Sequence, residues 1–258
     1  MERVSKSGLS FYRNQAWQGV RHGIFTRQGG ASKSHWSSLN LGASIGDDPA
    51  AVVENHRRIY DAVEVNPRSA VSSWLVHSVE TLVINGNTSS NGQLKKADAI
   101  ITDQADRPLV MRYADCVPLL LYDPVRRAIG LGHAGWRGTV KGMAGKMVRE
   151  MRFAFGCLPE DIQAVIGPAI SRRNYRVGAD VVAEADAYFG EDAGVVARDP
   201  AGGTQTFDLW RANQLDLSRH GVTEVEVLDI CTYENTDEFY SHRAEEGMTG
   251  RFGVVISL

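Results

Sequence analysis

The sequence predicts an α+β fold in which strands outnumber helices. Short apolar runs bounded by Pro, Gly or charged residues recur along the chain and are typical of buried strands. Helical patterns interrupt these runs at irregular intervals, whereas a doubly wound sheet would alternate strand and helix regularly. The chain has 258 residues, of which 43% are hydrophobic, so we expect a single domain over residues 1–258 with a substantial core.

The first predicted helix covers residues 50–63. Asp47 and Asp48 can cap its free N–H groups, and Pro49 suits its first turn. Further helices are predicted over 138–153, 181–189 and 208–217. The predicted strands are 99–101, 109–111, 117–122, 128–132, 161–166, 222–228 and 252–258. Polar, glycine-containing segments at 87–93 and 202–203 are predicted to be loops.

The composition argues against several classes of partner. The formal net charge is −3 and the pI about 6.2, so neither nucleic acid nor an anionic membrane is expected, although a basic local pocket fits within an acidic chain. No run of about 18 apolar residues predicts a membrane span, and segment 1–7 is too polar for a signal peptide. Three cysteines, an odd and low number, argue against a disulfide framework. We therefore expect a cytoplasmic protein.

Three residues have the side chains and settings of metal ligands. Cys116 lies at the tight connection between two predicted strands. His133 lies in the glycine-rich segment 130–138, and His77 lies in the strand-like run 74–79. Zinc binds thiolate and imidazole, and three protein ligands would leave a fourth position open, as in catalytic sites. The spacings of 39 and 17 residues contain no short chelating signature, so by themselves they also fit a small buried cysteine and a structural histidine.

Many stretches, all in the same order, resemble the YfiH family, which is also called the multicopper polyphenol oxidase (laccase) family. The strongest are Ala-Asp-Cys-Val-Pro at 114–118 and Gly-His-Ala-Gly-Trp-Arg-Gly at 132–138. The other matching stretches lie at 22–30, 38–42, 46–49, 54–57, 76–77, 166–170, 231–233, 239–243 and 249–251. The resemblance covers nearly the whole chain.

The resemblance implies a four-layer α/β/β/α arrangement with mixed β-sheets. It also implies that zinc is bound by His77, Cys116 and His133. Members of the family are reported to phosphorolyse adenosine, inosine, guanosine and methylthioadenosine, and to deaminate adenosine. Some are described as polyphenol oxidases, and bacterial members are linked to the editing of peptidoglycan precursors. The expected partners are therefore small molecules, namely a purine nucleoside and phosphate.

Three positions depart from the pattern of the family. Leu75 stands where a glutamine usually precedes Val-His, which removes a polar group beside the metal and bears on substrate preference. Ala169 and Glu234 stand where the family often has cysteines. The missing cysteines would matter for redox chemistry and matter little for a zinc site.

Phosphorolysis needs cationic groups that hold phosphate. Guanidinium groups bind phosphate oxygens through two parallel hydrogen bonds. The predicted substrate-binding residues, all inside the matching stretches or beside them, are Asn40, Arg57, Arg137 and Arg243.

The predicted catalytic residues are Cys116, His133 and Asp115. Deamination needs a carboxylate that carries a proton. Asp115, adjacent to Cys116, and Glu80, three positions past His77, are the candidates. A turn cap or the orientation of a zinc ligand are alternative roles for Asp115. Without metal, Cys116 would be a nucleophile and His133 its base, as in a cysteine hydrolase that edits peptidoglycan precursors.

The histidines bear on the choice of metal. There are seven, and no two form the His-x-His pairs that copper clusters use. This favours zinc over copper as the cofactor, with a copper polyphenol oxidase and a non-catalytic binding module as alternatives. The leading prediction is a zinc-dependent purine nucleoside phosphorylase with adenosine deaminase activity.

Overall fold

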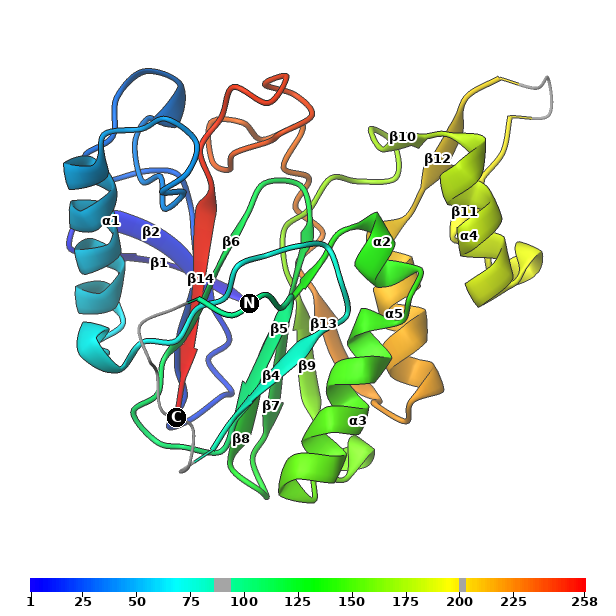
Figure 1. Ribbon diagram of the computed structural model, residues 1–258, viewed down its shortest axis with the longest axis horizontal. Helices are drawn as coiled ribbons and strands as arrows, with labels where there is room; N and C mark the ends of the chain where they lie inside the picture. The colour runs from blue at the N-terminus through cyan, green and yellow to red at the C-terminus, as the bar shows by residue number, and fades with distance from the viewer. Residues whose placement is uncertain (86–93, 200–202) are drawn as a thin grey trace.

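Helices and sheets are stacked in four layers in the computed structural model, in the order helix, sheet, sheet, helices (Figure 1). The structure describes residues 1–85, 94–199 and 203–258. The loop predicted over 87–93, and Gly202 of the second predicted loop, lie outside the described residues. The predicted α+β class and the four-layer arrangement are confirmed.

The first sheet has five strands and is antiparallel throughout. Its order is β1 (Glu2–Lys6), β2 (Leu9–Arg13), β3 (Arg21–Phe25), β14 (Phe252–Ser257) and β6 (Leu109–Tyr113). The last strand, red in Figure 1, therefore lies between β3 and β6. This pairing joins segments from both ends of the chain in one sheet.

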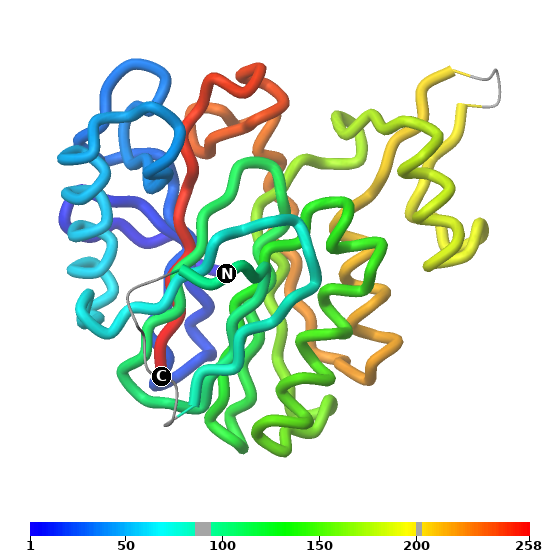
Figure 2. Tube along the Cα trace, in the orientation of Figure 1, coloured from blue at the N-terminus to red at the C-terminus, as the bar shows by residue number. Residues whose placement is uncertain are grey.

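The second sheet has six strands and is mixed. Its order is β13 (Glu224–Val227), β9 (Gln163–Ile166), β7 (Val117–Asp123), β8 (Ala128–Ala134), β5 (Ala99–Thr102) and β4 (Thr81–Ile84). The outer pairs β13–β9 and β5–β4 are parallel, and the inner pairs are antiparallel. A third, small sheet of β10 (Arg176–Val177), β12 (Gln205–Phe207) and β11 (Val196–Ala197) lies with α4 (Ala179–Phe189) at the upper right of Figure 2.

Helices cover the outer face of each large sheet (Figure 1). On the five-stranded sheet lies α1 (Pro49–Ala62). On the six-stranded sheet lie α3 (Met143–Phe155), preceded by the short α2 (Trp136–Thr139), and α5 (Leu209–Arg219). Single turns of 3-10 helix occur at Ser34–Trp36, Pro67–Ser69, Pro159–Asp161 and Glu191–Ala193.

Side chains along a strand alternate between the layers, because a strand has a period of two residues. In β14, Val255 packs under α1, whereas Val254 and Ile256 pack between the sheets. In β7, Leu120 packs between the sheets and Leu119 packs under the helices. Both faces of these strands are buried, which explains why their sequences are continuous apolar runs.

The predicted elements agree with the structure to within two residues, apart from one helix and the strand expected around His77. The helix predicted over 138–153 is divided, because Gly142 adopts a left-handed φ of +73° between α2 and α3. The strand expected around His77 is wrong, since His77 lies in a bend with φ +57°. Seven strands, β1–β4 and β10–β12, were not predicted.

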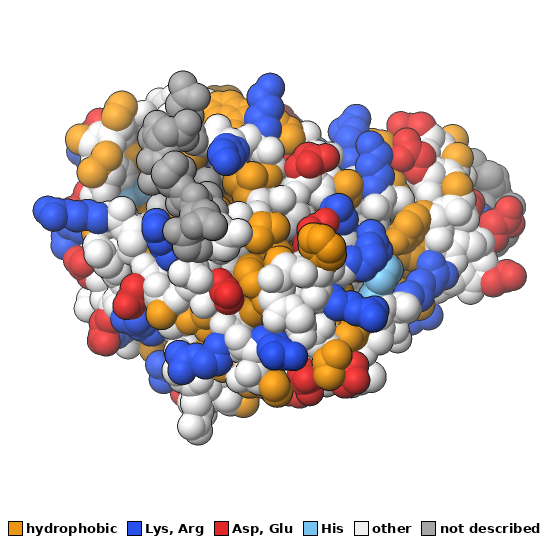
Figure 3. All heavy atoms as spheres, turned by 60° about the horizontal axis from the view of Figure 1, so that its bottom comes forward, with side chains coloured by type: hydrophobic (Ala, Val, Ile, Leu, Met, Phe, Trp, Pro, Cys, Tyr) orange, Lys and Arg blue, Asp and Glu red, His pale blue; other side chains and the backbone are white. Residues whose placement is uncertain are grey.

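None of the described helices is long and apolar enough to cross a membrane. On the face in Figure 3, basic and acidic side chains are interspersed. This mixture agrees with the near balance of 28 basic and 31 acidic residues.

Candidate metal centre and active-site cavity

Three side chains converge where the chain crosses from one large sheet to the other. Cys116 lies in the bend between β6 and β7, His133 lies near the end of β8, and His77 lies in the bend before β4. Their ligand atoms all lie within 4.8 Å of one another. Ligand atoms of a tetrahedral zinc site stand about 3.5 Å apart, so small side-chain rotations would close the three around one ion.

Strand pairing brings Cys116 and His133 together. β7 and β8 are antiparallel neighbours, with Pro118 opposite His133 and Val117 opposite Ala134. Continuing this register by one residue places Cys116 opposite Gly135. A Cβ at Gly135 would lie 3.0 Å from Cys116 Sγ and 3.2 Å from His77 Cδ2. Glycine is therefore required at this position by the close approach of the side chains and not by its backbone angles, which are extended.

Asp98, which was not predicted, organises two of the three side chains. It is fully buried just before β5. Its carboxylate accepts hydrogen bonds from His133 Nδ1 at 3.0 Å, from the His77 N–H at 3.0 Å and from the Val76 N–H at 3.2 Å. It also accepts from the N–H and the hydroxyl of Ser78 at 2.7 and 2.9 Å. One carboxylate thus holds both the ring of His133 and the left-handed bend that carries His77.

The charges at this centre depend on one another. Burial raises the pKa of the Cys116 thiol, but the positive charge of His133 and hydrogen bonds from both imidazoles outweigh burial and lower the pKa to about 6. Burial lowers the pKa of His133, but the charges of Cys116 and Asp98 and their hydrogen bonds raise it above its ordinary value. Burial also disfavours ionised Asp98, yet its hydrogen bonds from His133 and Ser78 lower its pKa to about 2. A thiolate therefore lies beside imidazole donors.

This set of donor atoms fits zinc. A thiolate and two imidazoles are ligands that zinc binds readily. Because ionised Asp98 accepts the hydrogen bond from His133 Nδ1, the Nε2 lone pair is left for a metal, an arrangement common around zinc. Over residues 1–85, 94–199 and 203–258, this is the one group of three or more His, Cys, Asp or Glu side chains that could hold a metal ion.

The three side chains open into a cavity of about 580 Å³. Four arginines line it: Arg112, Arg137, Arg243 and Arg251. Among the described residues, none of the four has an ion pair with a carboxylate; three of them donate to backbone carbonyls instead. Two also lie over aromatic rings, Arg137 over Trp136 and Arg243 over Tyr175. The cavity is therefore strongly positive and open to an anion.

Apolar side chains form the remaining wall of this cavity. Trp74, which is 49% exposed, lines it together with Trp136 and Tyr175. Leu75, at the position where the family usually has glutamine, and Leu209 complete the wall. Flat aromatic side chains stack well on planar heterocycles. The cavity thus combines groups for an anion with groups for a flat ring.

Two of the four predicted substrate-binding residues, Arg137 and Arg243, line the cavity. Asn40 does not line it. Its fully buried side chain accepts hydrogen bonds from the N–H groups of Gly42 at 2.8 Å and Arg251 at 2.9 Å. Asn40 therefore supports the cavity wall from behind.

Arg57 requires a correction, because the structure does not bring it to the cavity. It lies on the solvent side of α1, where its guanidinium pairs with Glu54 at 2.8 Å and Asp61 at 2.5 Å. These partners lie three and four residues away along the same helix, so helical periodicity directs all three side chains outward. Arg57 is a surface ion-pair residue.

Asp115 lines the cavity beside Cys116 and has a left-handed φ of +81°. Its Oδ1 accepts from the Thr232 hydroxyl at 2.7 Å, and its Oδ2 accepts from the Arg243 N–H at 2.7 Å. Both oxygens are therefore engaged with the protein. They tie the bend that carries Cys116 to the segment that carries Arg243.

Asp98, Arg112 and Arg251 were not among the predicted site residues. A signal was present for each of them: Arg251 ends the matching stretch 249–251, Arg112 interrupts the apolar strand β6, and Asp98 directly precedes the apolar strand β5. Charged residues are rarely buried without a partner, so a charge inside or beside a buried strand marks a functional or structural role.

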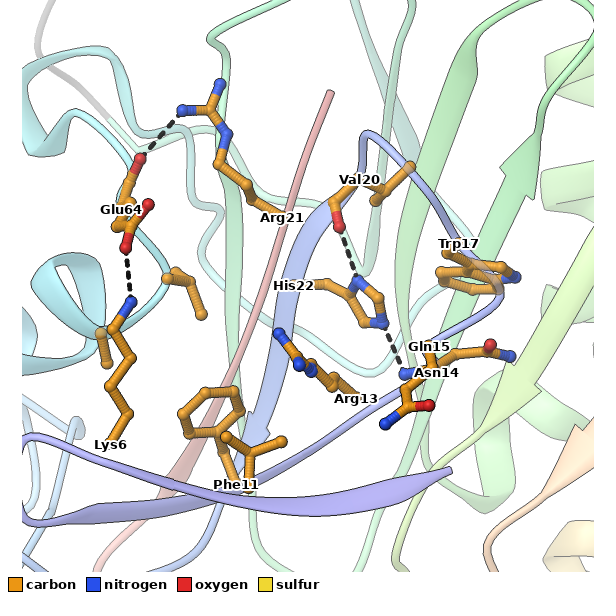
Figure 4. Close-up of a pocket in the computed structure, with 13 residues that line it drawn as sticks. Lys6, Phe11, Arg13, Asn14, Gln15, Trp17, Val20, Arg21, His22 and Glu64 are labelled. Atoms are coloured by element: carbon orange, nitrogen blue, oxygen red, sulfur yellow. Dashed lines mark hydrogen bonds and ion pairs between the residues drawn. The ribbon is translucent and has the colours of Figure 1, made fainter.

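A second cavity, of about 450 Å³, lies against β2 and β3 (Figure 4). Inside it, His22 Nδ1 donates to the Val20 carbonyl at 3.0 Å and Nε2 accepts from the Asn14 N–H at 2.8 Å. Burial lowers the pKa of His22 to about 4. Lys6 is paired with Glu64. His22 is thus a neutral structural group with both ring nitrogens engaged.

Comparisons with known proteins cover nearly the whole chain. The family model described as multi-copper polyphenol oxidoreductase laccase matches residues 21–258. Purine nucleoside phosphorylase YlmD of Bacillus subtilis is 35% identical over 246 residues, covering 92% of this chain and 88% of that protein. A purine nucleoside phosphorylase of Bacteroides thetaiotaomicron is 33% identical over 262 residues, covering 97% of each.

Solved structures show the same fold. The crystal structure of Bacillus licheniformis hypothetical protein YfiH matches with a TM-score of 0.92 at 30% identity, over 99% of this chain and 98% of that chain. YlmD from Geobacillus stearothermophilus matches with a TM-score of 0.90 at 32% identity, over the same shares.

Proposed function

The chain belongs to the multi-copper polyphenol oxidoreductase laccase family, and on that premise we propose that it is a zinc-dependent purine nucleoside phosphorylase. Relatives that carry the name purine nucleoside phosphorylase support an enzyme of this class. The observation that carries the proposal is the cavity. It joins a candidate thiolate–imidazole metal centre to an aromatic wall and to four arginines that have no carboxylate partner in the part of the chain that the structure describes. The arginines suit phosphate, the aromatic wall suits a purine, and the thiolate with its two imidazoles suits a metal ion.

The reaction places defined demands on this cavity. An oxygen of phosphate forms a bond to C1′ of the ribose, and the bond from C1′ to the purine nitrogen breaks with its electron pair going to the base. The base then takes up a proton, and ribose 1-phosphate is the other product. Guanidinium groups would hold the phosphate and the aromatic wall would hold the purine, so that the reacting atoms meet in a fixed orientation.

Zinc would be held by His77, Cys116 and His133 and would supply a Lewis acid for a substrate oxygen or ring nitrogen. The protein's own part is to hold the donors ready. Asp98 keeps the Nδ1 proton of His133 and leaves Nε2 free. Asp115 holds the backbone of the segment that carries a cavity arginine, so we assign it a positioning role in phosphorolysis.

The proposed nucleosides are adenosine, inosine, guanosine and methylthioadenosine, with deamination of adenosine as a companion activity. Deamination needs a group that moves protons. Asp115 is the carboxylate among the described lining residues and is the proposed carrier. Because both of its oxygens already accept hydrogen bonds from the protein, we propose phosphorolysis as the principal reaction.

The direct test is to incubate zinc-loaded protein with adenosine or inosine, with and without phosphate. Release of ribose 1-phosphate that requires phosphate is expected, and inosine formed from adenosine without phosphate reports deamination. The Cys116→Ala variant should lose both zinc and activity. The proposal would be overturned by zinc-loaded, folded protein that releases no sugar 1-phosphate from any of the four nucleosides, that is, neither ribose 1-phosphate nor, from methylthioadenosine, 5-methylthioribose 1-phosphate.

A second candidate, a cysteine hydrolase acting on peptidoglycan precursors, is favoured by one observation. Cys116, His133 and Asp98 follow one another as nucleophile, base and orienting carboxylate. His77 would have no part in that chemistry, although it also hydrogen-bonds Cys116. The hydrolase predicts full activity after chelation and loss of activity after alkylation of Cys116, whereas the phosphorylase predicts loss of activity after chelation.

Copper is the alternative metal, as in the polyphenol oxidase activity that the family description names. Metal analysis of protein purified without added metal separates the two metals. Zinc near one ion per chain supports the phosphorylase. Copper at that ratio, together with oxygen uptake in the presence of a phenol, supports the oxidase.

A further inference from the structure

Arg112 and Arg251 face the same side of the five-stranded sheet. Arg112 of β6 pairs with Gly253 of β14, and Arg251 precedes Gly253 by two residues. The two arginines are therefore diagonal neighbours on one face, about 7–8 Å apart at their Cα atoms and within reach of long side chains. Further along this face, Val110 and Val255 are buried under α1. The apolar layer under α1 thus gives way to two cations at the end nearest the cavity.

Both guanidinium groups are half-buried and have no carboxylate partner among the described residues. Arg112 donates to the Ser73 carbonyl at 3.1 Å. Arg251 donates to the carbonyls of Thr249 at 3.0 Å and Gly250 at 2.7 Å. Burial lowers the pKa of both groups. Two neighbouring cations partly removed from water, with no ion pair to a carboxylate among the described residues, cost free energy, and an anion bound between them would offset that cost.

The surroundings of Arg251 hold it in place. Its N–H donates to the buried Asn40 at 2.9 Å, and its side chain packs so closely on Gly42 that a Cβ there would lie 3.0 Å from Arg251 Cγ. Arg251 lines the same cavity as Cys116 and His133, so an anion bound to it shares that cavity with the proposed metal centre. A preorganised cation beside the reacting groups is what the binding of an anionic co-substrate requires.

The other two cavity arginines are placed differently. Arg137 and Arg243 are exposed, and their guanidinium groups lie 4.4 and 5.3 Å from the ring centroids of Trp136 and Tyr175. They belong to the aromatic wall. The cavity therefore has a half-buried cationic end and an exposed aromatic end.

We propose that Arg112 and Arg251 form the subsite for a phosphate dianion, the inorganic co-substrate, while the aromatic end holds the nucleoside. This inference rests on the proposed phosphorylase function and locates one of its two substrates. It assigns the phosphate to two arginines that were not among the predicted substrate-binding residues.

The kinetic test uses Arg112→Met and Arg251→Met in zinc-loaded protein, with Arg57→Ala as the control on the surface of α1. Each Met variant should raise the KM for phosphate by about 10- to 100-fold, because a hydrogen bond to a charged group is lost. The KM for inosine should change less than about threefold, and the control should change neither constant. Arg→Lys at both positions keeps the charge without the fork and should give intermediate values. An unchanged KM for phosphate in both Met variants overturns the assignment.

A second measurement needs neither variants nor turnover. Phenylglyoxal modifies accessible guanidinium groups, and peptide mass spectrometry reports each arginine separately. Inorganic phosphate should slow the modification of Arg112 and Arg251 in wild-type protein and leave Arg57 unaffected. Protection in a protein that releases no ribose 1-phosphate upholds the subsite and overturns the phosphorylase. Turnover without protection upholds the phosphorylase and overturns the subsite.

Adenosine 5′-monophosphate tests whether the subsite binds free phosphate or the phosphate group of a nucleotide. If the nucleotide protects both arginines at concentrations where inorganic phosphate does not, the subsite serves a nucleotide and the assignment to inorganic phosphate is overturned. Equal or stronger protection by inorganic phosphate supports the assignment.

Discussion

Asp98 and His133 are joined twice. The carboxylate of Asp98 accepts a hydrogen bond from His133 Nδ1 at 3.0 Å, and the backbone carbonyl of Asp98 accepts one from the His133 N–H at 2.7 Å. The second bond extends the antiparallel pairing of β5 and β8, in which Ala99 lies opposite Gly132. The same strand pairing that builds the sheet therefore sets the orientation of an imidazole in the proposed metal centre.

Replacing Asp98 by Asn should weaken zinc binding. An amide cannot accept all five hydrogen bonds, and its N–H₂ group would face the donors of Val76, His77 or Ser78. Loss of a carboxylate behind a ligating histidine typically lowers metal affinity by about 10- to 100-fold. Competition with a chromophoric chelator measures the change.

The matched control is Asp208→Asn, at the N-cap of α5, where Asp208 accepts from the Arg211 N–H and Asn is an equally good cap. It should bind zinc like the wild type. Equal zinc affinity in Asp98→Asn and the control would show that the carboxylate does not support the site.

Asp98 should also make zinc-free protein sensitive to acid. Its folded pKa is lowered to about 2, below the ordinary value, so its contribution to stability is present above about pH 4 and is lost as the pH falls toward 2. The contribution corresponds to about 2 kcal/mol of unfolding free energy. Urea unfolding of wild type and Asp98→Asn at several pH values checks this. The difference between them should shrink on acidification, and a constant difference would contradict the assignment.

Gly135→Ala should disturb the metal centre without straining the backbone. The added Cβ would crowd Cys116 Sγ at 3.0 Å and His77 at 3.2 Å, so we expect zinc affinity to fall at least about tenfold. Gly138→Ala is the control in the same segment, because its Cβ would meet the Ser78 carbonyl oxygen at an ordinary 3.4 Å. Isothermal titration with zinc distinguishes them, and equal affinities would refute the crowding argument.

In zinc-free protein, the Cys116 thiol should react faster than the Cys157 thiol. Burial raises its pKa, but His133 and His77 lower it to about 6, whereas burial and Asp123 raise the pKa of Cys157. At pH 7, iodoacetamide should therefore label Cys116 well before Cys157, and the rate should fall as the pH drops below about 6 and the thiolate is protonated. Peptide mass spectrometry gives both rates. A midpoint near the ordinary thiol value of about 8.5 would contradict the coupling to the imidazoles.

Local features of the fold could be predicted from the sequence because their physical causes are local. Asp48 caps α1 by accepting from the Ala50 N–H at 2.9 Å, and Asp208 caps α5 in the same way. Apolar runs predicted strands such as β7 because both faces of these strands are buried. The exposed edge strand β1 escaped prediction because it has no such run.

The site was partly predictable for the same reason. Cys116 at a tight connection, His133 among glycines and His77 in an apolar run are visible as short patterns, and the family resemblance joined the three as ligands of one metal ion. The strand expected around His77 was wrong because the N–H groups of its bend donate to Asp98, which is distant in sequence. A local pattern has no information on such a partner.

The sequence by itself determined the capped helices, the strands that are buried on both faces and the residues that have metal-binding side chains. Only the tertiary structure decided which charged side chains lie next to one another. Arg57 turns outward because its partners lie on its own helix. Arg112 and Arg251 come together because β6 pairs with β14, strands from distant parts of the chain. Strand order depends on packing of the whole molecule, so the phosphate subsite that we propose exists only once both sheets have formed.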